Sequence, residues 1–288
     1  MLWQIFSFEV RYWLRSWMLW IFLLIIAAMV FFATATDYVT LGDALTNTYR
    51  NAPFVIQNYY SFMGLFAILM ATAFVNSAAA RDFNFNTHQI IFSTPMRRFD
   101  FLIGRFLGAT IVSFIPILGV SAGVLLAKLM PWIVPERWGP VVWKAHLNGV
   151  LVFAIPNAFI IASILFAIAV LARNEIASFV GSVGLLVAYI ATDGLLQNVE
   201  RQKIGAVFDP FGIRTYAYIT RYWTVADKNT LSADYSGYML WNRLLWITVA
   251  LAIFVFAYYR FSFTERKKKS RADSSERAAA PIAAAPFP

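Results

Sequence analysis

The chain has 288 residues, of which 60% are hydrophobic and 14% are charged, and its formal net charge is +9. A water-soluble domain of this length needs more polar surface to cover its core, so the composition excludes that class. Cysteine is absent, which excludes disulfides, thiolate catalysis and cysteine-ligated metals. The apolar residues form blocks of about 20 or more, the length that an α-helix needs to cross a hydrocarbon core.

These blocks predict an all-α integral membrane protein with six transmembrane helices and an N-terminal interfacial helix. Residues 1–16 are amphipathic and aromatic, which favours a helix lying in the membrane interface. Residues 33–35 match a small-x-small cleavage site, but the apolar stretch before them exceeds a typical signal-peptide core, so we expect the first span to be retained. The spans are expected at 17–36, 57–80, 103–127, 142–171, 176–196 and 239–259.

The segments between and after these spans are polar. Residues 37–56 are predicted to be a loop, and 197–238 form a long polar and aromatic segment. Residues 265–288 contain a basic cluster, which we interpret as a stop-transfer signal, and an Ala/Pro-rich stretch typical of a linker or disordered tail. Ala-Pro repeats of this kind are common where a chain continues into a longer polypeptide.

An even number of spans places both termini on one side of the membrane. With the termini inside, more Lys and Arg side chains lie inside than outside, and the excess is sharpest at the span ends. We therefore expect a multi-pass protein of a bacterial inner membrane, with both termini in the cytoplasm. The same charge is not interpreted as nucleic-acid binding, because no basic stripe with interleaved aromatics lies outside the apolar blocks.

Few polar groups lie within the expected spans. Asn157 either lines a pathway or makes an interhelical hydrogen bond. Asp193 either contacts a substrate or reaches the membrane interface. Gly119 and Gly123 form a GxxxG pattern that permits close helix packing. The spans otherwise look almost free of charge, which argues against a proton- or sodium-coupled transporter.

Motifs for chemistry are missing from the sequence. GxxxxGK[ST] and HExxH do not occur, so neither a phosphate-cradling loop nor a zinc peptidase motif is present. No GxSxG nucleophile elbow is expected either, because the residues that match these letters, Gly119 to Gly123, lie inside an expected span and not at a strand-to-helix turn. The two histidines, His88 and His146, are expected on opposite sides of the membrane. We therefore expect no catalytic residues, no metal and no cofactor in this chain.

Residues 81–108 carry a resemblance beyond composition. They read as a short amphipathic helix, a basic pair and the entry to the third span, and their order resembles the cytoplasmic coupling region of ABC-2-type exporter permeases. The matching residues are Thr87, Ile90, Ile91, Ser93, Thr94, Pro95, Arg97, Gly104, Arg105 and Gly108. Gln89 stands where the family often has Glu, and Arg105 where it often has Lys. The resemblance implies that an ATPase is contacted through Thr87, Gln89, Ile91, Phe92, Pro95, Arg97 and Arg98.

The resemblance covers about residues 1–264 and implies a function. Such a chain is the permease half of an ATP-driven exporter, paired with a second six-span half, identical or not, and driven by a separate ABC-type ATP-binding subunit. Membrane lipid is the other expected partner. The alternative is a membrane anchor or scaffold for a peptidase or assembly complex, without transport. The substrate is not predicted.

A narrower resemblance concerns the segment before the sixth span. Asp209-Pro210-Phe211-Gly212, Thr220 to Thr224 and Asn242 to Trp246 resemble bacterial permeases fused to a zinc aminopeptidase. In that family a six-span half comes first, a second membrane half follows and the peptidase is C-terminal. The Ala/Pro-rich stretch would then be a linker.

Overall fold

The computed structural model describes residues 1–261, apart from 40, 42–46, 86, 88–90, 92, 94–95, 174 and 196–201. For residues 83, 175 and 193–195 it describes the backbone alone. Within these residues the chain is helical and contains no strand, which confirms the all-α fold class. The basic cluster and the Ala/Pro-rich stretch predicted at 265–288 lie outside the described residues.

Four helical stretches are long and apolar enough to cross a membrane: α2 (Trp17–Ala35), Arg98–Ala127, Trp143–Ala172 and α14 (Gly237–Arg260). The bent pair α3 (Pro53–Met63) and α4 (Phe66–Asn84) adds a fifth if it is counted as one span. In α10 (Glu175–Leu195) the apolar helix at Ile176–Thr192 is shorter. A multi-pass membrane protein is therefore confirmed, with four or five spans by helix length.

The second predicted span is a broken helix rather than a continuous one. We expected a loop to residue 56 and one helix over 57–80, but α3 already begins at Pro53 and the pair bends by 46° at Gly64 and Leu65. Proline at the first helical position costs no hydrogen bond, because the backbone N–H of any residue there would have no acceptor within the helix. Gly64 at the break packs closely against another helix: the space that a Cβ on Gly64 would need is filled by the Asn157 side-chain amide.

Two further spans are continuous but irregular at proline. The third comprises α6 (Arg98–Phe114), the 3₁₀ turn η1 (Ile115–Leu118) around Pro116, and α7 (Gly119–Ala127). The fourth comprises α8 (Trp143–Asn148), the π-helical turn η3 (Gly149–Ala154) and α9 (Ile155–Ala172), with Pro156 next to the turn. Proline removes one backbone donor, and the changed local winding absorbs that loss.

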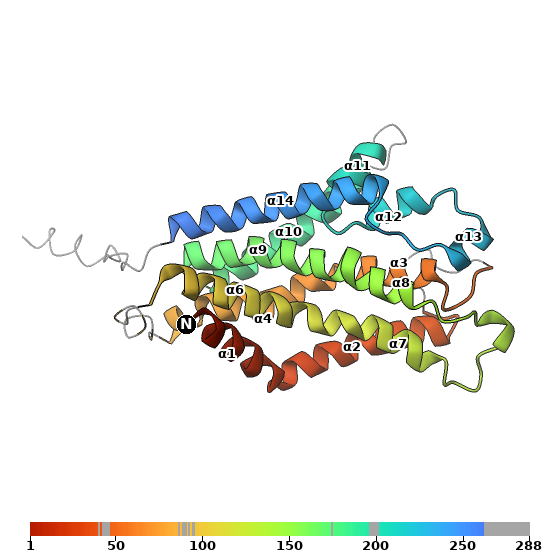
Figure 1. Ribbon diagram of the computed structural model, residues 1–288, viewed down its shortest axis with the longest axis horizontal. Helices are drawn as coiled ribbons and strands as arrows, with labels where there is room; N and C mark the ends of the chain where they lie inside the picture. Colours follow the sequence, from red (N-terminus) through yellow and green to blue (C-terminus); the bar gives the residue numbers. More distant parts are fainter. Residues whose placement is uncertain are drawn as a thin grey trace, which may run out of the picture.

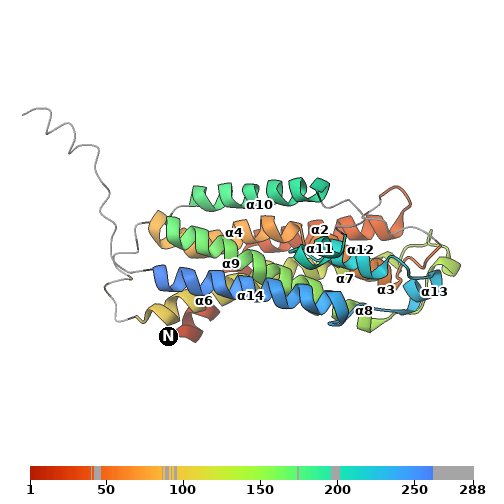
Figure 2. The same ribbon diagram turned by 90° about the horizontal axis from the view of Figure 1, so that it is seen from above.

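The long helices run side by side along one axis (Figure 1). Helix α2 packs against α7, and α9 packs against α4 and α14. Helix α10 lies along one edge of the bundle, against α9 and α4 (Figure 2). The GxxxG pattern brings α2 and α7 together: Cβ atoms on Gly119 and Gly123 would lie 2.7 Å from the Leu23 carbonyl oxygen and 2.5 Å from that of Ala27. Larger side chains there would separate the two backbones.

The segment predicted as polar and aromatic, 197–238, is partly helical. It contains α11 (Gln202–Phe208), α12 (Ile213–Thr220) and α13 (Val225–Thr230). Its last part is held to α3: the Gln57 amide accepts from the Ala233 N–H at 2.8 Å and donates to the Ala233 carbonyl at 2.8 Å. The side-chain amide of Gln57 thus pairs with both backbone polar groups of Ala233, so the polar groups of the helix side chain and of the loop are satisfied together.

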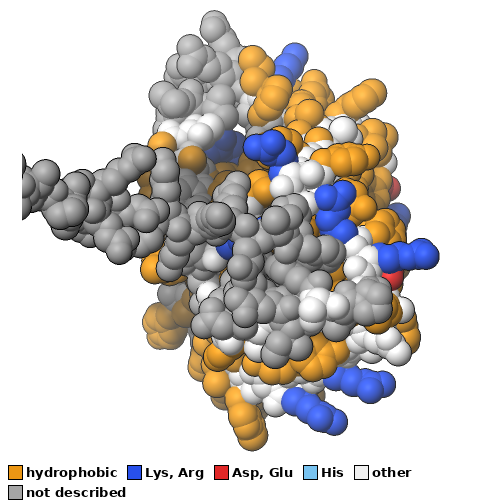
Figure 3. All heavy atoms as spheres, turned by 90° about the vertical axis from the view of Figure 1, so that its left-hand side faces the viewer, with side chains coloured by type: hydrophobic (Ala, Val, Ile, Leu, Met, Phe, Trp, Pro, Cys, Tyr) orange, Lys and Arg blue, Asp and Glu red, His pale blue; other side chains and the backbone are white. Residues whose placement is uncertain are grey.

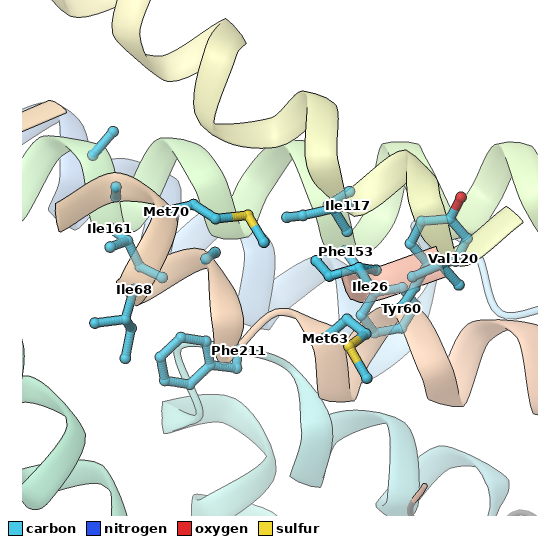
Figure 4. Close-up of a cluster of buried hydrophobic side chains, with 14 of the residues drawn as sticks. Ile26, Tyr60, Met63, Ile68, Met70, Ile117, Val120, Phe153, Ile161 and Phe211 are labelled. Carbon is cyan, nitrogen blue, oxygen red and sulfur yellow. The ribbon is translucent and has the colours of Figure 1, made fainter. Parts of the chain in front are cut away.

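The apolar core runs through the centre of the bundle. Ile68 and Met70 of α4, Ile161 of α9 and Phe211 of the α11–α12 turn are buried there (Figure 4). The α11–α12 turn therefore reaches between the long helices. The remaining described elements are α1 (Leu2–Leu14), which meets α2 at an angle in Figure 1, and the short turn η2 (Pro135–Arg137).

Candidate functional site

A cluster of buried charges lies at the end of the bundle that holds the N-terminus. Its members are Glu9 of α1, Arg81 and Asp82 of α4, and Arg105 of α6, and we call it the Glu9 cluster. Arg81 pairs with Glu9, and Arg105 pairs with Asp82 at 2.5 Å and approaches Glu9 to 4.0 Å. The Glu9 side chain is wholly buried. Three elements that are distant in sequence are therefore joined by charge.

The Glu9 carboxyl experiences opposing effects. Burial raises its pKa above the ordinary value, while the guanidinium groups of Arg81 and Arg105 act in the opposite direction. Arg81 also lies over the rings of Phe8 and Tyr12, at 5.3 Å and 4.8 Å from their centroids. Paired ions with these contacts are costly to separate, because each would leave a buried charge alone. The cluster therefore holds α1 in one position against α4 and α6.

Helix α1 is seated on two glycines of α6. A Cβ on Gly104 would lie 3.0 Å from the Cβ of Ile5, and one on Gly108 would lie 2.7 Å from the Cβ of Glu9. Arg105, between these glycines, is the residue that reaches Asp82 and Glu9. The Gly-Arg-x-x-Gly part of the motif found in the sequence thus has a structural role that the sequence alone did not indicate: it seats the N-terminal helix.

The predicted coupling residues fall into three groups. Thr87 and Arg97 are exposed, and Ile91 is half-buried. Ile91 lines a groove of about 230 Å³ together with residues of α1 and α6, Glu9 and Arg105 among them. Gln89, Phe92 and Pro95 lie outside the described residues. The segment that follows α4 therefore begins close to Arg81 and Asp82 of the Glu9 cluster, and its residue Ile91 lies in one groove with Glu9 and Arg105.

Arg98 is engaged within the chain. Its Nη1 donates to the Phe261 carbonyl at 2.7 Å, and its guanidinium lies 4.7 Å from the Tyr258 ring centroid. Arg98 thus joins the start of α6 to the end of α14. Arg97 is the exposed member of the predicted basic pair. Figure 3 shows this end of the molecule: on its right-hand side Lys and Arg side chains project among hydrophobic ones, and few acidic side chains are visible.

A second polar cluster is buried near the opposite end of the bundle, around Arg243 of α14. Its Nη1 donates to the Asn157 Oδ1 at 2.9 Å, and its Nη2 donates to the Phe211 carbonyl at 3.0 Å. Asn157 donates to the same carbonyl at 3.0 Å. Asp209 accepts from the N–H groups of Phe211 at 3.0 Å and Arg214 at 2.6 Å. The α11–α12 turn is therefore fixed between α9 and α14.

This second cluster corrects the expectation of almost charge-free spans. Arg243 lies inside α14 and is buried, so the sixth predicted span carries a charge within it. Of the two readings for Asn157, the interhelical hydrogen bond is present, through Arg243. A role of Asn157 in a pathway stays a prediction. Asp193 belongs to α10, but its side chain is outside the described residues. A signal was available: an Asn-Arg pair is unusual in an apolar block.

A third set of polar groups links α3, α7 and α8. The Tyr60 hydroxyl lies 2.6 Å from the Ser121 Oγ, which lies 2.8 Å from the His146 Nδ1. A serine next to a histidine is also found in hydrolases, where a third group orients the base. Here the second neighbour of Ser121 is a tyrosine, and the three side chains join three helices. Among the described residues, His, Asp and Glu do not form a group that could hold a metal.

Comparison with models of known protein families and with curated proteins finds no match for this chain. The resemblance to ABC-2-type permeases therefore rests on the motif at 81–108 and on the predicted layout of helices. The cluster around Arg243 lies outside that motif, whereas the Glu9 cluster shares Arg81, Asp82 and Arg105 with it.

Proposed function

We propose that this chain is the membrane-spanning permease half of an ATP-driven ABC-2-type exporter in a bacterial inner membrane. The observation that carries the proposal is the surface next to the Glu9 cluster. Phe85 is 73% exposed and Phe99 is 50% exposed, and Arg97, which precedes Phe99 closely in the sequence, is exposed as well. Exposed aromatic rings and an exposed cation in the segment that joins two helices of a buried charge cluster fit a protein partner.

The Glu9 cluster gives this surface a physical connection to the spans. The segment 85–97 joins α4 directly to α6, and Arg81, Asp82 and Arg105 tie both helices to α1. A partner that moves the segment would therefore move three helices together, because separating the buried ion pairs is costly. In this proposal an ATP-binding subunit supplies the movement and the chain itself carries no catalysis. Repacking of rigid helical units is a common way to switch access.

Six crossings are part of the proposal. Arg98 at the start of α6 contacts Phe261 after α14, and Arg81 near the end of α4 contacts Glu9. Both contacts lie at the N-terminal end of the bundle, so the number of crossings between the two ends is even. Counting α3 with α4 and including α10 gives six, with both termini on the cytoplasmic side. A thin bundle of six helices is expected to pair with a second half.

The test is recovery of an ATP-binding subunit with the tagged chain from native membranes. We expect Phe85→Asp and Arg97→Glu to reduce the recovered subunit about tenfold, since each removes a contact and introduces an unpaired charge at the interface. Arg260→Glu is the matched control, because Arg260 is an exposed arginine at the same end of the bundle. Recovery should be normalised to the amount of permease.

Equal recovery with all three variants would contradict the coupling surface. Absence of any ATP-binding subunit from the wild-type sample would contradict the exporter. A peptidase or assembly factor recovered in its place would favour the membrane scaffold.

A further inference from the structure

A groove of about 660 Å³ follows one face of α1 and ends where α2 begins. Ser7, Arg11 and Arg15 line it, and their four-residue spacing places them along the same face of the helix. Ser16, the residue that caps α2, closes the lining at the corner between the two helices. The groove is therefore polar along its length and carries two arginines.

The groove keeps the two positive charges of Arg11 and Arg15. Both side chains are exposed, and within the described part of the chain neither guanidinium has a hydrogen bond, an ion pair or an aromatic ring contact. The described residues that line the groove include no carboxylate. Arg81 contacts two aromatic rings of the wall, but its own charge is paired with Glu9. An anion in the groove would therefore meet two cations that are not neutralised by a described neighbour.

The two arginines can hold one anion together. Side chains four residues apart on a helix are neighbours, with Cβ atoms about 5–6 Å apart. Each guanidinium presents paired donors that match the oxygens of a phosphate. Ser16 supplies a further donor: its Oγ accepts from the Met18 N–H at 3.3 Å, which leaves the hydroxyl hydrogen for a ligand. These donors therefore suit a group with several free oxygens.

The groove ends at the level where the chain enters the membrane. Helix α2, one of the four spans, begins at Trp17, directly after Arg15 and Ser16. Trp17 is 82% exposed and Trp20 is 48% exposed, and tryptophan near the end of a span lies at the depth of the headgroups. Helix α1 meets α2 at an angle at this point (Figure 1). Phospholipid phosphates are therefore the nearest abundant anions to Arg15.

Phe8 and Tyr12 give the groove an apolar wall beside its arginines. Their rings stack with centroids 6.1 Å apart, and they are 55% and 46% exposed. Aromatic rings at this depth can contact the glycerol and the first methylene groups of a lipid. This wall favours a phospholipid over a soluble anion, which has no apolar part to place against the rings.

We propose that this groove binds the phosphate of one anionic phospholipid from the leaflet next to α1, with Arg11 and Arg15 as its ligands. The glycerol of the lipid lies against Phe8 and Tyr12. A headgroup without a cation of its own is preferred, because the choline of phosphatidylcholine already neutralises its phosphate. The bound lipid holds the corner between α1 and α2 at the membrane surface. This inference rests on the membrane location and does not depend on the exporter proposal.

The test uses the purified full chain in nanodiscs of equal parts phosphatidylglycerol and phosphatidylcholine, and native mass spectrometry counts the lipids that stay bound. We expect about tenfold more phosphatidylglycerol than phosphatidylcholine to be retained, because each arginine near a membrane surface favours anionic lipid. Equal retention would overturn the lipid and leave the two arginines to an anionic protein partner. Displacement of the lipid by added glycerol 3-phosphate would overturn it in favour of a soluble phosphate.

Two double variants and one control separate the groove from general surface charge. Arg11→Gln with Arg15→Gln should lower the ratio of the two lipids to about one. Arg11→Lys with Arg15→Lys should keep about a third of the preference, because lysine has the charge without the paired donors. Arg260→Gln replaces an exposed arginine at the end of α14 and should leave the ratio unchanged. A control that falls as far as the glutamine variant, or full preference in the lysine variant, would overturn the groove.

A crosslinking experiment locates the lipid in the wild-type chain without any substitution. The probe is a phosphatidylglycerol with a photoreactive diazirine on its headgroup, and mass spectrometry maps the adducts after illumination. We expect the adducts to concentrate on residues 4–20. Adducts spread evenly over the ends of the other spans would overturn the site. Thermal unfolding of each variant shows that the changes in lipid retention come from folded protein.

Discussion

Single buried polar side chains decide how the α11–α12 turn is held. Arg243 donates to Asn157 and to the carbonyls of Pro210 and Phe211, so one guanidinium satisfies acceptors from two elements. Lysine carries the same charge but has no planar set of donors to reach all three. Arg243 is therefore a structural residue by its contacts.

Substitution of Arg243 tests this role. Arg243→Met should destabilise the protein by about 3 kcal/mol, because it removes the donor to the Asn157 Oδ1 and the Pro210 carbonyl and one of the two arginines that act on Asp209. Arg243→Lys should recover only part of that loss. Thermal unfolding in detergent, followed by tryptophan fluorescence, measures both. Arg260→Met on the same helix is exposed and should change stability by no more than about 0.5 kcal/mol. An Arg243→Met variant as stable as this control would contradict the interpretation.

At the scale of elements, glycine contacts decide how the helices approach. Helix α1 sits on Gly104 and Gly108 of α6, as α2 sits on Gly119 and Gly123 of α7. Both contacts use a four-residue spacing, which places two glycines on one face of a helix. The same glycine spacing thus seats both α1, which lies outside the apolar blocks, and α2, which is one of them.

Gly108→Leu should separate α1 from α6, because a Cβ there would lie 2.7 Å from the Cβ of Glu9. Cysteines at Ile5 and Gly104, present in every variant compared, report the distance: their Cβ atoms would lie 3.0 Å apart, and a small shift brings them to the separation of about 3.5–4.5 Å usual in a disulfide. The chain has no other cysteine. Oxidation should protect this pair from maleimide, and adding Gly108→Leu should restore labelling. Gly184→Leu on α10 has open space around it and serves as the control. Full protection in both variants would show that α1 does not depend on Gly108.

At the scale of the whole molecule, both ends of the described chain lie at one end of the bundle, and η2 and α13 lie at the other (Figure 1). In the proposed topology these two ends of the bundle lie on opposite sides of the membrane, where each can be reached by a reagent. The basic residues around the N-terminal end agree with a cytoplasmic position for it.

Single cysteines test the topology in intact cells. Glu136→Cys in η2 and Ala226→Cys in α13 are exposed positions and should react with an impermeant thiol reagent from outside. Arg11→Cys and Arg260→Cys, exposed at the other end, should react only after the membrane is permeabilised. Labelling of Arg11→Cys in intact cells would reverse the orientation. Labelling at only one of Glu136 and Ala226 would contradict the six crossings.

The sequence by itself determined where the apolar helices lie. Each expected span is largely helical, and residues 1–16 form the expected separate helix. The bounds of the first, fourth, fifth and sixth spans agree to within two residues, whereas α6 begins at Arg98 instead of 103, and the second span extends from Pro53 to Asn84 with a break at Gly64 and Leu65. This success has a local cause, since a run of about 20 apolar residues has few alternatives in a membrane. The motif at 81–108 was also a local pattern, and it located Gly104, Arg105 and Gly108 without indicating what they contact.

The tertiary structure alone decided which polar groups meet. Glu9 pairs with a residue 72 positions away, and Arg243 with one 86 positions away, and neither pairing has a local sequence signal. The close approach of Asn157 to Gly64 at the break likewise joins two different spans. Partners of this kind follow from how the helices pack against one another. Hydropathy carries no information on this packing, because it describes only how readily each segment enters an apolar environment. For that reason the sequence predicted the helices of this protein, whereas packing placed its buried charges.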